Sequence, residues 1–263
     1  MILVAGGDSF IFGTELTDQT RGIHSKQTYP AILASAAGMH YECVARPGAS
    51  NSEIARHVIN YCETHKDIDK VVLVQWTFAN RYEFNFVNSG WQSINVWNLQ
   101  DSDEITAQLR TFSQKTIDDQ IKTNKHLKFS GNYKFLDEFY KRVAVTEFWE
   151  IYTSLKEVVY LQNYLKINNV PYMFTFADNS LMFNSTVDNK IVDVECLYNQ
   201  IELEKFFMFQ GDSTVDGKSH KGFYQWAMEN KYPVGATHPL EEAHKAAALL
   251  IKDKFNELVK EHI

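Results

Sequence analysis

Cysteine is scarce in this sequence. The 263 residues include Cys43, Cys62 and Cys196, and no two of them form a C-x-x-C pair. This sparse, odd-numbered set argues against a disulfide framework and against a zinc-finger type of metal site, so we expect reduced thiols in a cytosol-like compartment. Cys43 and Cys62 fall at apolar positions of a predicted strand and a predicted helix, where packing is the usual role of an unpaired cysteine.

Long apolar runs and basic clusters are also missing. No stretch approaches the roughly 20 apolar residues that a membrane helix needs, and the apolar run 2–5 is not preceded by the basic segment of a signal peptide. The formal net charge is -7 at pH 7, with lysine and arginine scattered along the chain. Nucleic-acid binding favours a basic patch. We therefore expect a cytoplasmic protein without a nucleic-acid or membrane partner.

What the sequence does contain is an alternation of strand and helix patterns. Hydrophobic residues make up 44% of the chain, enough for a sizeable core. Short, continuous apolar runs typical of buried parallel strands alternate with segments of helical periodicity. This order predicts an α/β fold, a three-layer α/β/α sandwich with a central parallel sheet, in a single domain over 1–263. The expected strands are 2–5, 41–45, 71–76 and 172–176, and the expected helices are 29–37, a segment capped at Ser50, 139–168, 220–230 and 243–262.

The segment 78–131 interrupts this alternation. It is aromatic and polar with weak periodicity, apart from a helical pattern at 103–123, and we interpret it as an insertion after the third strand. Aromatic side chains concentrate in and just before it. They suit either a sugar-stacking wall or, as we favour, the insertion's own core. These side chains are Trp76, Tyr82, Phe84, Phe86, Trp91 and Trp97.

A candidate nucleophile follows the first strand. In a parallel sheet, functional residues sit in loops beyond the carboxyl ends of the strands, and the first such loop reads Gly6-Gly7-Asp8-Ser9. The two glycines let other groups approach the backbone closely, and the serine hydroxyl can be exposed there. The alternative is that Ser9 only caps the next segment. A second Gly-Asp-Ser occurs at 211–213, but no convincing strand precedes it.

A histidine near the other end of the chain is the candidate base. His238 precedes Pro239 just before the last predicted helix, and proline favours an extended conformation in the residue before it. An extended backbone at the start of a helix fixes the direction of the imidazole, as a general base requires. The alternative is that His238 is an ordinary surface histidine. His238 and His244 are six residues apart, a weak pattern for metal ligands, so we expect no metal site.

Together, the two segments resemble the SGNH (GDSL-like) hydrolase superfamily. Gly7-Asp8-Ser9 matches the family's nucleophile motif after the first strand, and His238-Pro239 matches the motif of its base before the last helix. The resemblance implies a flavodoxin-like fold and a serine esterase or acylhydrolase in which Asp8 shapes the nucleophile turn. It implies no cofactor and a small ester as substrate, often an O-acetyl group on a carbohydrate. The forms GASN and HPLEEAH are also similar to SGNH-like proteins encoded by bacteriophages, which implies such an origin.

The oxyanion-binding blocks of the family are matched less closely. The resemblance implies a backbone N–H donor after the second strand, with which Gly48 or Asn51 aligns. It also implies an asparagine side chain after the third strand, where this chain has Thr77, with Asn80 as the alternative if the loop is longer. Arg81 either orients a negatively charged substrate group or is simply solvated. A backbone N–H donor needs no particular side chain, so either Gly48 or Asn51 can supply it without loss of function.

The acid of the expected triad is missing. Three residues before His238 the family has aspartate, whereas this chain has Gly235. In serine hydrolases that acid fixes the tautomer of the histidine and stabilises the imidazolium. Three possibilities remain: a dyad of Ser9 and His238, an acid from the insertion, or an impaired site.

The missing acid leaves other functions open. The main alternative to an esterase is a non-catalytic or weakly active SGNH-fold binding or structural module. A nucleotide-binding α/β domain is disfavoured, because the glycines after the first strand are not followed by a P-loop lysine or a G-x-G-x-x-G motif.

Overall fold

The computed structural model describes residues 1–87, 89–95, 133–144, 146–182, 188, 191–210 and 220–260. Three features named above lie outside the described residues: the helical pattern at 103–123, Trp97 and the second Gly-Asp-Ser motif.

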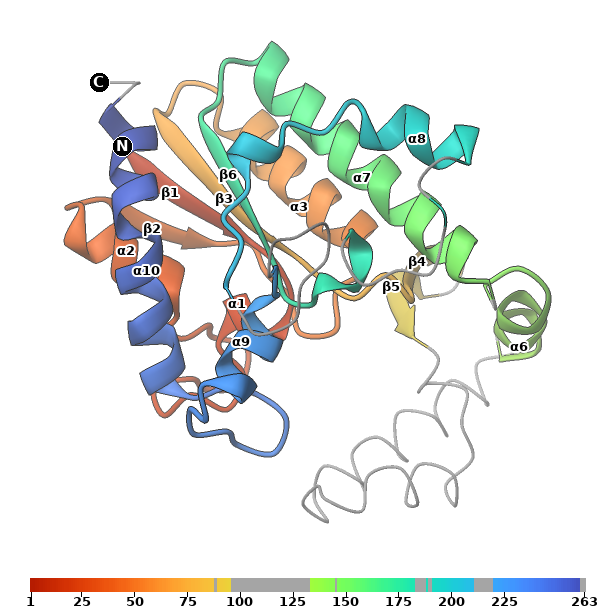
Figure 1. The fold of residues 1–263 in the computed structure, drawn as a ribbon, viewed down its shortest axis with the longest axis horizontal. Coiled ribbons are helices and arrows are strands. Elements are labelled where there is room, and N and C mark those ends of the chain that lie inside the picture. Colours follow the sequence, from red (N-terminus) through yellow and green to blue (C-terminus); the bar gives the residue numbers. More distant parts are fainter. Residues whose placement is uncertain are drawn as a thin grey trace.

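Four parallel strands form the centre of the fold (Figure 1). They are β1 (Ile2–Gly6), β2 (His40–Cys43), β3 (Lys70–Trp76) and β6 (Tyr172–Phe176). Their order across the sheet is β2-β1-β3-β6, and each neighbouring pair is parallel. Every residue of β3 is buried. A strand covered on both faces needs such a continuous apolar run rather than an alternating one.

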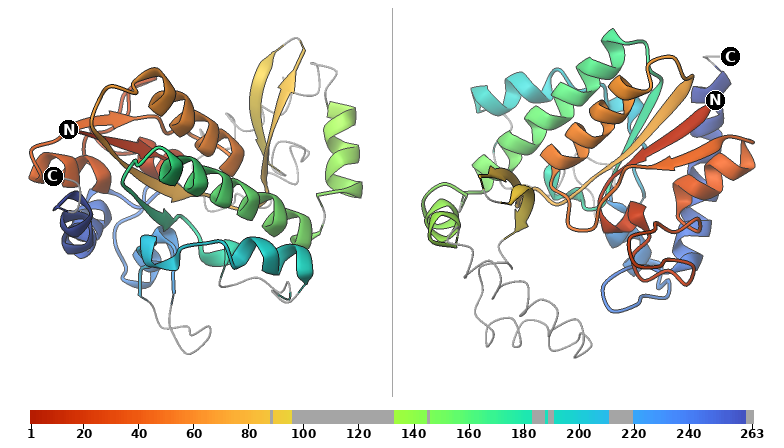
Figure 2. Two further views of the ribbon diagram at one scale, coloured as in Figure 1. Left: turned by 90° about the horizontal axis from the view of Figure 1, so that it is seen from above. Right: turned by 180° about the vertical axis from the view of Figure 1, so that it is seen from behind.

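Helices cover both faces of the sheet, which confirms the predicted three-layer α/β fold. One face carries α3 (Asn51–Thr64), α7 (Glu147–Ile167) and α8 (Val192–Tyr198), and the other carries α2 (Tyr29–Ala36), α9 (Phe223–Glu229) and α10 (Glu241–Lys260) (Figures 1 and 2). Successive residues of a strand point to opposite faces. Accordingly, Val4 belongs to the core on the first face, and Leu3 and Ala5 belong to the core on the second.

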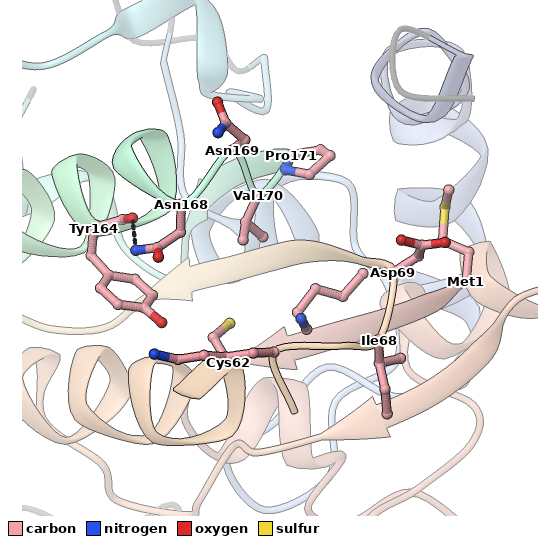
Figure 3. A pocket seen from close by; sticks show the side chains of 11 residues that line it. Met1, Cys62, Ile68, Asp69, Tyr164, Asn168, Asn169, Val170 and Pro171 are labelled. Carbon is pink, nitrogen blue, oxygen red and sulfur yellow. Dashed lines mark hydrogen bonds between the residues drawn. The ribbon is translucent and has the colours of Figure 1, made fainter. Parts of the chain in front are cut away.

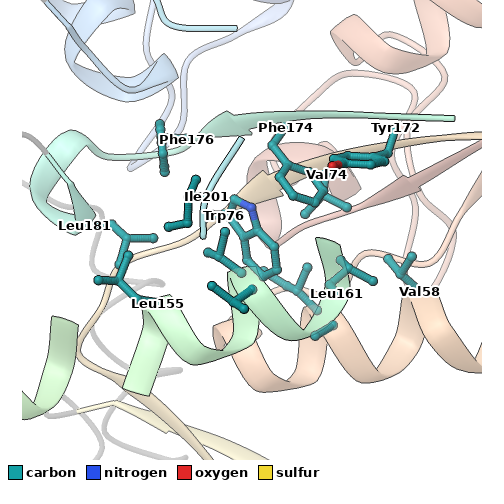
Figure 4. Close-up of a cluster of buried hydrophobic side chains, with 14 of the residues drawn as sticks. Val58, Val74, Trp76, Leu155, Leu161, Tyr172, Phe174, Phe176, Leu181 and Ile201 are labelled. Carbon is teal, nitrogen blue, oxygen red and sulfur yellow. The ribbon is translucent and has the colours of Figure 1, made fainter. Parts of the chain in front are cut away.

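Trp76 lies in the core between the sheet and the α3–α7 layer (Figure 4). Its side chain is fully buried, and its ring meets that of Phe174 edge-on, with centroids 5.3 Å apart. Aromatic pairs prefer this geometry to a face-to-face stack. Trp76 is therefore a core residue and contributes nothing to a sugar-stacking wall.

A β-hairpin lies within the proposed insertion, and a helix follows directly after it. They are β4 (Arg81–Phe86), the antiparallel β5 (Gly90–Asn95) and α6 (Tyr133–Arg142). Tyr82, Phe84 and Phe86 pack with residues of α6 in a small separate core, as we favoured from the sequence. Trp91 is not part of this small core: its ring is half exposed and lies beneath the Arg56 guanidinium.

Two helix predictions are corrected by the structure. The single helix expected at 139–168 is two helices, because α6 ends at Arg142 and Thr146 caps α7 with its hydroxyl, which accepts from the Trp149 N–H at 3.4 Å. The helix expected at 220–230 begins only at α9, because Gly222 before it is extended. Two short 3-10 helices, η2 (Asn179–Leu181) and η3 (Leu203–Lys205), complete the described elements after β6.

Candidate active site

Ser9 is the first residue of a short helix at the carboxyl end of β1. This helix, α1 (Ser9–Phe12), has Asp8 as its N-cap, whose Oδ1 accepts from the Phe10 N–H at 3.0 Å. Gly13 ends the helix with a φ of 77°, a value that favours glycine, and its N–H donates to the Ser9 carbonyl at 2.9 Å. Both ends of the helix are therefore fixed, which holds Ser9 in place.

Asp8 is a buried carboxylate that joins three loops of the site. Its Oδ2 accepts from the Thr77 hydroxyl at 2.6 Å and from the Arg81 guanidinium at 3.0 Å. The same guanidinium donates to the Ala49 carbonyl at 3.2 Å. A charge in a protein interior is tolerated only when it is paired and hydrogen-bonded. The pair of Asp8 and Arg81 therefore fixes the nucleophile turn against the loops that follow β2 and β3.

His238 lies before α10 with one ring nitrogen facing a carboxylate. Its Nδ1 is 3.0 Å from Glu15 Oε1 and 2.6 Å from the Thr237 hydroxyl oxygen. The imidazole packs edge-on against the Phe10 ring, with centroids 5.1 Å apart. A tight turn holds the backbone, since the Gly235 N–H donates to the His238 carbonyl at 2.9 Å. With Nδ1 engaged, Nε2 is the nitrogen left for another group.

Glu15 is the site residue that sequence reasoning missed. It lies in the loop after α1, 223 positions before His238, and its carboxylate also accepts from the Thr237 N–H at 3.2 Å and from the Thr237 hydroxyl at 3.0 Å. Burial acts to raise the pKa of Glu15, but the hydrogen bonds and charge of His238 and the Thr237 donors lower it to about 2. Neither a bare dyad nor an acid from the insertion describes these contacts. The one signal in the sequence that pointed to an acid from elsewhere was Gly235, at the position where the resemblance predicts an aspartate.

Ser9 and His238 line one cavity of about 460 Å³. Gly48, Asn80 and Arg81 line it as well, so loops from both ends of the chain meet above the sheet. Among the described residues, no hydrogen bond joins Ser9 to His238. Such contacts are often long in unliganded enzymes and tighten when substrate binds.

Two of the backbone N–H groups at this cavity that have no acceptor in the described part of the chain point to anion binding. One belongs to Ser9 at the start of α1, and the other belongs to Gly48. Gly48 is the third residue of a turn that the Ala49 N–H closes on the Arg46 carbonyl at 3.1 Å, and its φ is 81°. Glycine is favoured at that position because the φ is positive. Both groups can therefore donate to a ligand.

Thr77 and Asn51 do not line this cavity. Thr77 is buried and its hydroxyl hydrogen is donated to Asp8, so the expectation that it supplies an oxyanion donor is corrected. The Asn51 side chain holds the Thr77 backbone: Oδ1 accepts from its N–H at 2.9 Å, and Nδ2 donates to Ser154 at 3.1 Å. Asn80, the alternative at this position, does line the cavity.

A groove of about 720 Å³ adjoins the cavity, and Thr14 and Pro47 line both. Among the residues that the structure describes, no aspartate or glutamate lines the groove. Arg21 and Arg46 are exposed there, and the described residues place no carboxylate in an ion pair with either. The arginine and histidine side chains of this lining are Arg21, His24, Arg46 and His57.

A further cavity of about 350 Å³ lies at the opposite end of the sheet (Figure 3). Met1, Asp69 and Pro171 line it, and these residues precede β1, β3 and β6. Ligands of open α/β sheets bind beyond the carboxyl ends of the strands, so the amino-end cavity is the less favoured site.

His244 is buried in α10, and its Nδ1 accepts from the Tyr29 N–H at 3.2 Å. Burial lowers its pKa to about 3, so this imidazole is neutral. The described residues contain no group of three side chains suited to hold a metal ion. Within the same ranges, no helix is both long and apolar enough to cross a bilayer.

The contacts of Glu15 predict that stability falls in acid. Its pKa is lowered from 4.5 to about 2 in the folded protein, so its contribution is complete above roughly pH 4.5 and is lost as the pH falls toward 2. Glu15→Gln cannot ionise. We therefore expect the difference in unfolding free energy between wild type and Glu15→Gln to shrink between about pH 6 and pH 2.5, as measured by urea titration. A difference that stays constant over this range contradicts the prediction.

Comparisons with known proteins find similarity only among solved structures. No family model matches the chain, and no curated protein matches it. A protein described as a lipolytic member of the G-D-S-L family, from Desulfitobacterium hafniense DCB-2, has 12% identity and a TM-score of 0.44, with 98% of each chain covered. The acetyl xylan esterase Est2A from the rumen bacterium Butyrivibrio proteoclasticus has 10% identity and a TM-score of 0.48, with 100% of this chain and 64% of that chain covered.

A third similar structure is the psychrotrophic esterase EstA from Pseudoalteromonas sp., with 11% identity, a TM-score of 0.41, and 99% of this chain and 97% of that chain covered. Similarity at this level assigns neither a family nor a residue role to the chain. The bacteriophage origin stays a prediction.

Proposed function

We propose that this protein is a serine hydrolase that cleaves small esters, with Ser9 as nucleophile and His238 as general base. The observation that carries the proposal is the shared cavity: a serine on a fixed turn and an imidazole with Nδ1 already engaged line the same space. Activation of serine needs a base with a free nitrogen in reach. His238 lines the same cavity as Ser9, and its Nε2 has no partner within the described ranges, which supports this role.

The reaction would proceed in two acyl transfers. In the first, Ser9 Oγ forms a bond to the ester carbonyl carbon while His238 Nε2 takes the hydroxyl proton. The C–O bond to the alcohol then breaks, and His238 returns the proton to the leaving oxygen. In the second transfer, water attacks the acyl-serine with the same base, and the carboxylic acid leaves as Ser9 regains its proton. No cofactor takes part in either transfer.

The oxyanion of each tetrahedral intermediate would be held by the Ser9 and Gly48 N–H groups. Both border the cavity and have no acceptor within the described ranges. The side chain of Asn80 is the candidate third donor. Arg81 also lines the cavity, but its charge is balanced by Asp8, which makes it a poor recognition group for a substrate anion. One such donor is worth about 10²- to 10³-fold in kcat.

Steady-state hydrolysis of 4-nitrophenyl esters tests this function. We expect turnover of the acetate and butyrate esters, and a decline with longer acyl chains in a cavity of about 460 Å³. Absence of turnover for every chain length, between about pH 6 and pH 9, would instead support the alternative of a non-catalytic binding module.

The adjoining groove suggests which alcohols the enzyme accepts. Arg21 and Arg46 face it without a carboxylate partner among the described residues, although the whole chain has a net charge of -7. An alcohol that carries a negative charge, such as an acidic sugar, would be favoured there. We expect Arg21→Ala/Arg46→Ala to lower kcat/KM for 3-acetoxybenzoate about three- to tenfold, the range for two exposed ion pairs.

The neutral methyl ester of 3-acetoxybenzoate is the matched substrate, and its kcat/KM should be unchanged in the double variant. Arg142→Ala, which removes an exposed cation from α6, is the matched protein control and should affect neither substrate. Equal losses for the charged and neutral esters would contradict the charge preference while leaving the esterase activity established.

A further inference from the structure

We propose that Glu15 is the residue that positions the catalytic histidine, and that Gly235 is a glycine because the Glu15 carboxylate occupies the space of its missing side chain. This inference rests on the proposed function. The acid that SGNH-like sequences carry three residues before the histidine has then been replaced by one from the nucleophile's own loop.

The carboxylate is aimed at His238 by a set of hydrogen bonds. Oε1 is 3.0 Å from His238 Nδ1, and the Thr237 N–H and hydroxyl donate to the two carboxylate oxygens at 3.2 Å and 3.0 Å. Glu15 and His238 are both largely shielded from solvent, with side-chain exposures of 24% and 13%. This geometry is more defined than that of a surface ion pair, which rarely has three donors on one carboxylate.

These contacts determine the position of the imidazole proton. An ionised carboxylate can only accept hydrogen bonds, and the pKa of Glu15 of about 2 keeps it ionised at neutral pH. The Thr237 hydroxyl donates its single hydrogen to Glu15, so it accepts from the ring. Nδ1 must therefore carry the proton, which leaves the lone pair on Nε2. That tautomer is the one a general base needs.

Space, rather than backbone conformation, explains the glycine at 235. Gly235 is absent from the residues with positive φ, so other side chains are compatible with its backbone. A Cβ at Gly235 would overlap Oε2 of Glu15, and the Cδ and Cβ atoms of Glu15 are the next nearest. A side chain at 235 and the carboxylate of Glu15 are thus mutually exclusive in this arrangement.

The backbone of Glu15 is also specialised. Its φ is 74°, in the left-handed region that residues other than glycine, asparagine and aspartate seldom adopt. The surrounding loop is held on both sides: Gly13 ends α1, and the Thr17 N–H donates to Glu241 of α10 at 2.7 Å. Unusual backbone conformations persist where the surroundings enforce them, and they concentrate at functional sites.

An exchange of the acid between the two positions tests the proposal. We expect Glu15→Ala to lower kcat for 4-nitrophenyl acetate about 10²- to 10⁴-fold with little change in KM, as for loss of the acid in other serine hydrolases. Gly235→Asp alone should also lose activity, because the new side chain and Glu15 compete for one space. The double variant Glu15→Ala/Gly235→Asp should recover at least tenfold over Glu15→Ala.

A structural role for Glu15 would not produce these results. Asp18→Ala is the matched control: it removes another carboxylate from the same loop, one that accepts from Ser25 and from the Lys26 N–H but does not touch His238. It should retain wild-type kcat.

A readout independent of activity separates this proposal from the proposed function. In ¹⁵N-labelled protein at neutral pH, we expect His238 to be protonated at Nδ1 in wild type and to lose that preference in Glu15→Ala. Retention of both kcat and the tautomer in Glu15→Ala overturns the inference, as does a double variant no more active than Glu15→Ala. If wild type hydrolyses no ester, the tautomer still decides the role of Glu15.

Discussion

Replacing Ser9 with alanine is expected to reduce kcat for ester hydrolysis by on the order of 10⁶, the scale seen when a serine hydrolase loses its nucleophile. Alanine has no group that can form the acyl-enzyme. The cavity, the candidate N–H donors and His238 remain, so only residual catalysis by these groups is expected. The measurement is the initial rate of 4-nitrophenyl acetate hydrolysis with an enzyme-free blank.

Ser213→Ala is the matched control for this prediction. It removes the serine of the second Gly-Asp-Ser motif, which follows no convincing strand pattern in the sequence, so its kcat should equal that of wild type. Urea unfolding of Ser9→Ala should show a nearly unchanged unfolding free energy, which excludes misfolding as the cause. Substantial hydrolysis by Ser9→Ala would show that another residue is the nucleophile.

Replacing Asp8 with alanine should destabilise the fold by about 3–5 kcal/mol, the range for breaking a buried ion pair from one side. Asp8 is fully buried, caps α1 and accepts from both Thr77 and Arg81. Its loss leaves the guanidinium without its carboxylate and removes the N-cap at the same time. Urea unfolding measures the effect as a lower midpoint with an unchanged m-value.

Asp137→Ala is the matched comparison for this stability prediction. It removes an aspartate that pairs with Lys141 on the surface of α6, and exposed pairs of this kind are worth at most about 0.5 kcal/mol. Asp8→Asn should fall between the two variants, because an amide can still cap α1 but carries no charge for Arg81. Equal effects of Asp8→Ala and Asp137→Ala would contradict the importance of the buried pair.

The architecture was predictable because its signals are local. The continuous apolar run of β3 specifies a strand covered on both faces, and Ser50 caps α3 through the Glu53 N–H at 3.2 Å, as its sequence pattern predicts. The hairpin β4–β5 was missed although its first strand alternates aromatic and polar residues over 81–86. The surrounding segment is so rich in aromatic residues that this short alternation did not stand out.

The site was only partly predictable because its decisive contacts join distant residues. The position of Ser9 and His238 at one cavity follows from the topology of a parallel sheet. Thr77 illustrates the limit: its place in the sequence suits an oxyanion donor, but its hydroxyl is used by Asp8, 69 positions away. Glu15 has no local pattern that marks it as an acid, and its carboxylate fills the space that a side chain at Gly235 would need, which only the folded structure shows.

The most direct test of the account is to treat the protein with a fluorophosphonate probe and to map the adduct by peptide mass spectrometry. Such probes phosphonylate a serine that an adjacent base activates. The account predicts one adduct, on Ser9, formed far more slowly in His238→Ala. An adduct on a different residue, or no adduct between about pH 6 and pH 9, would contradict it.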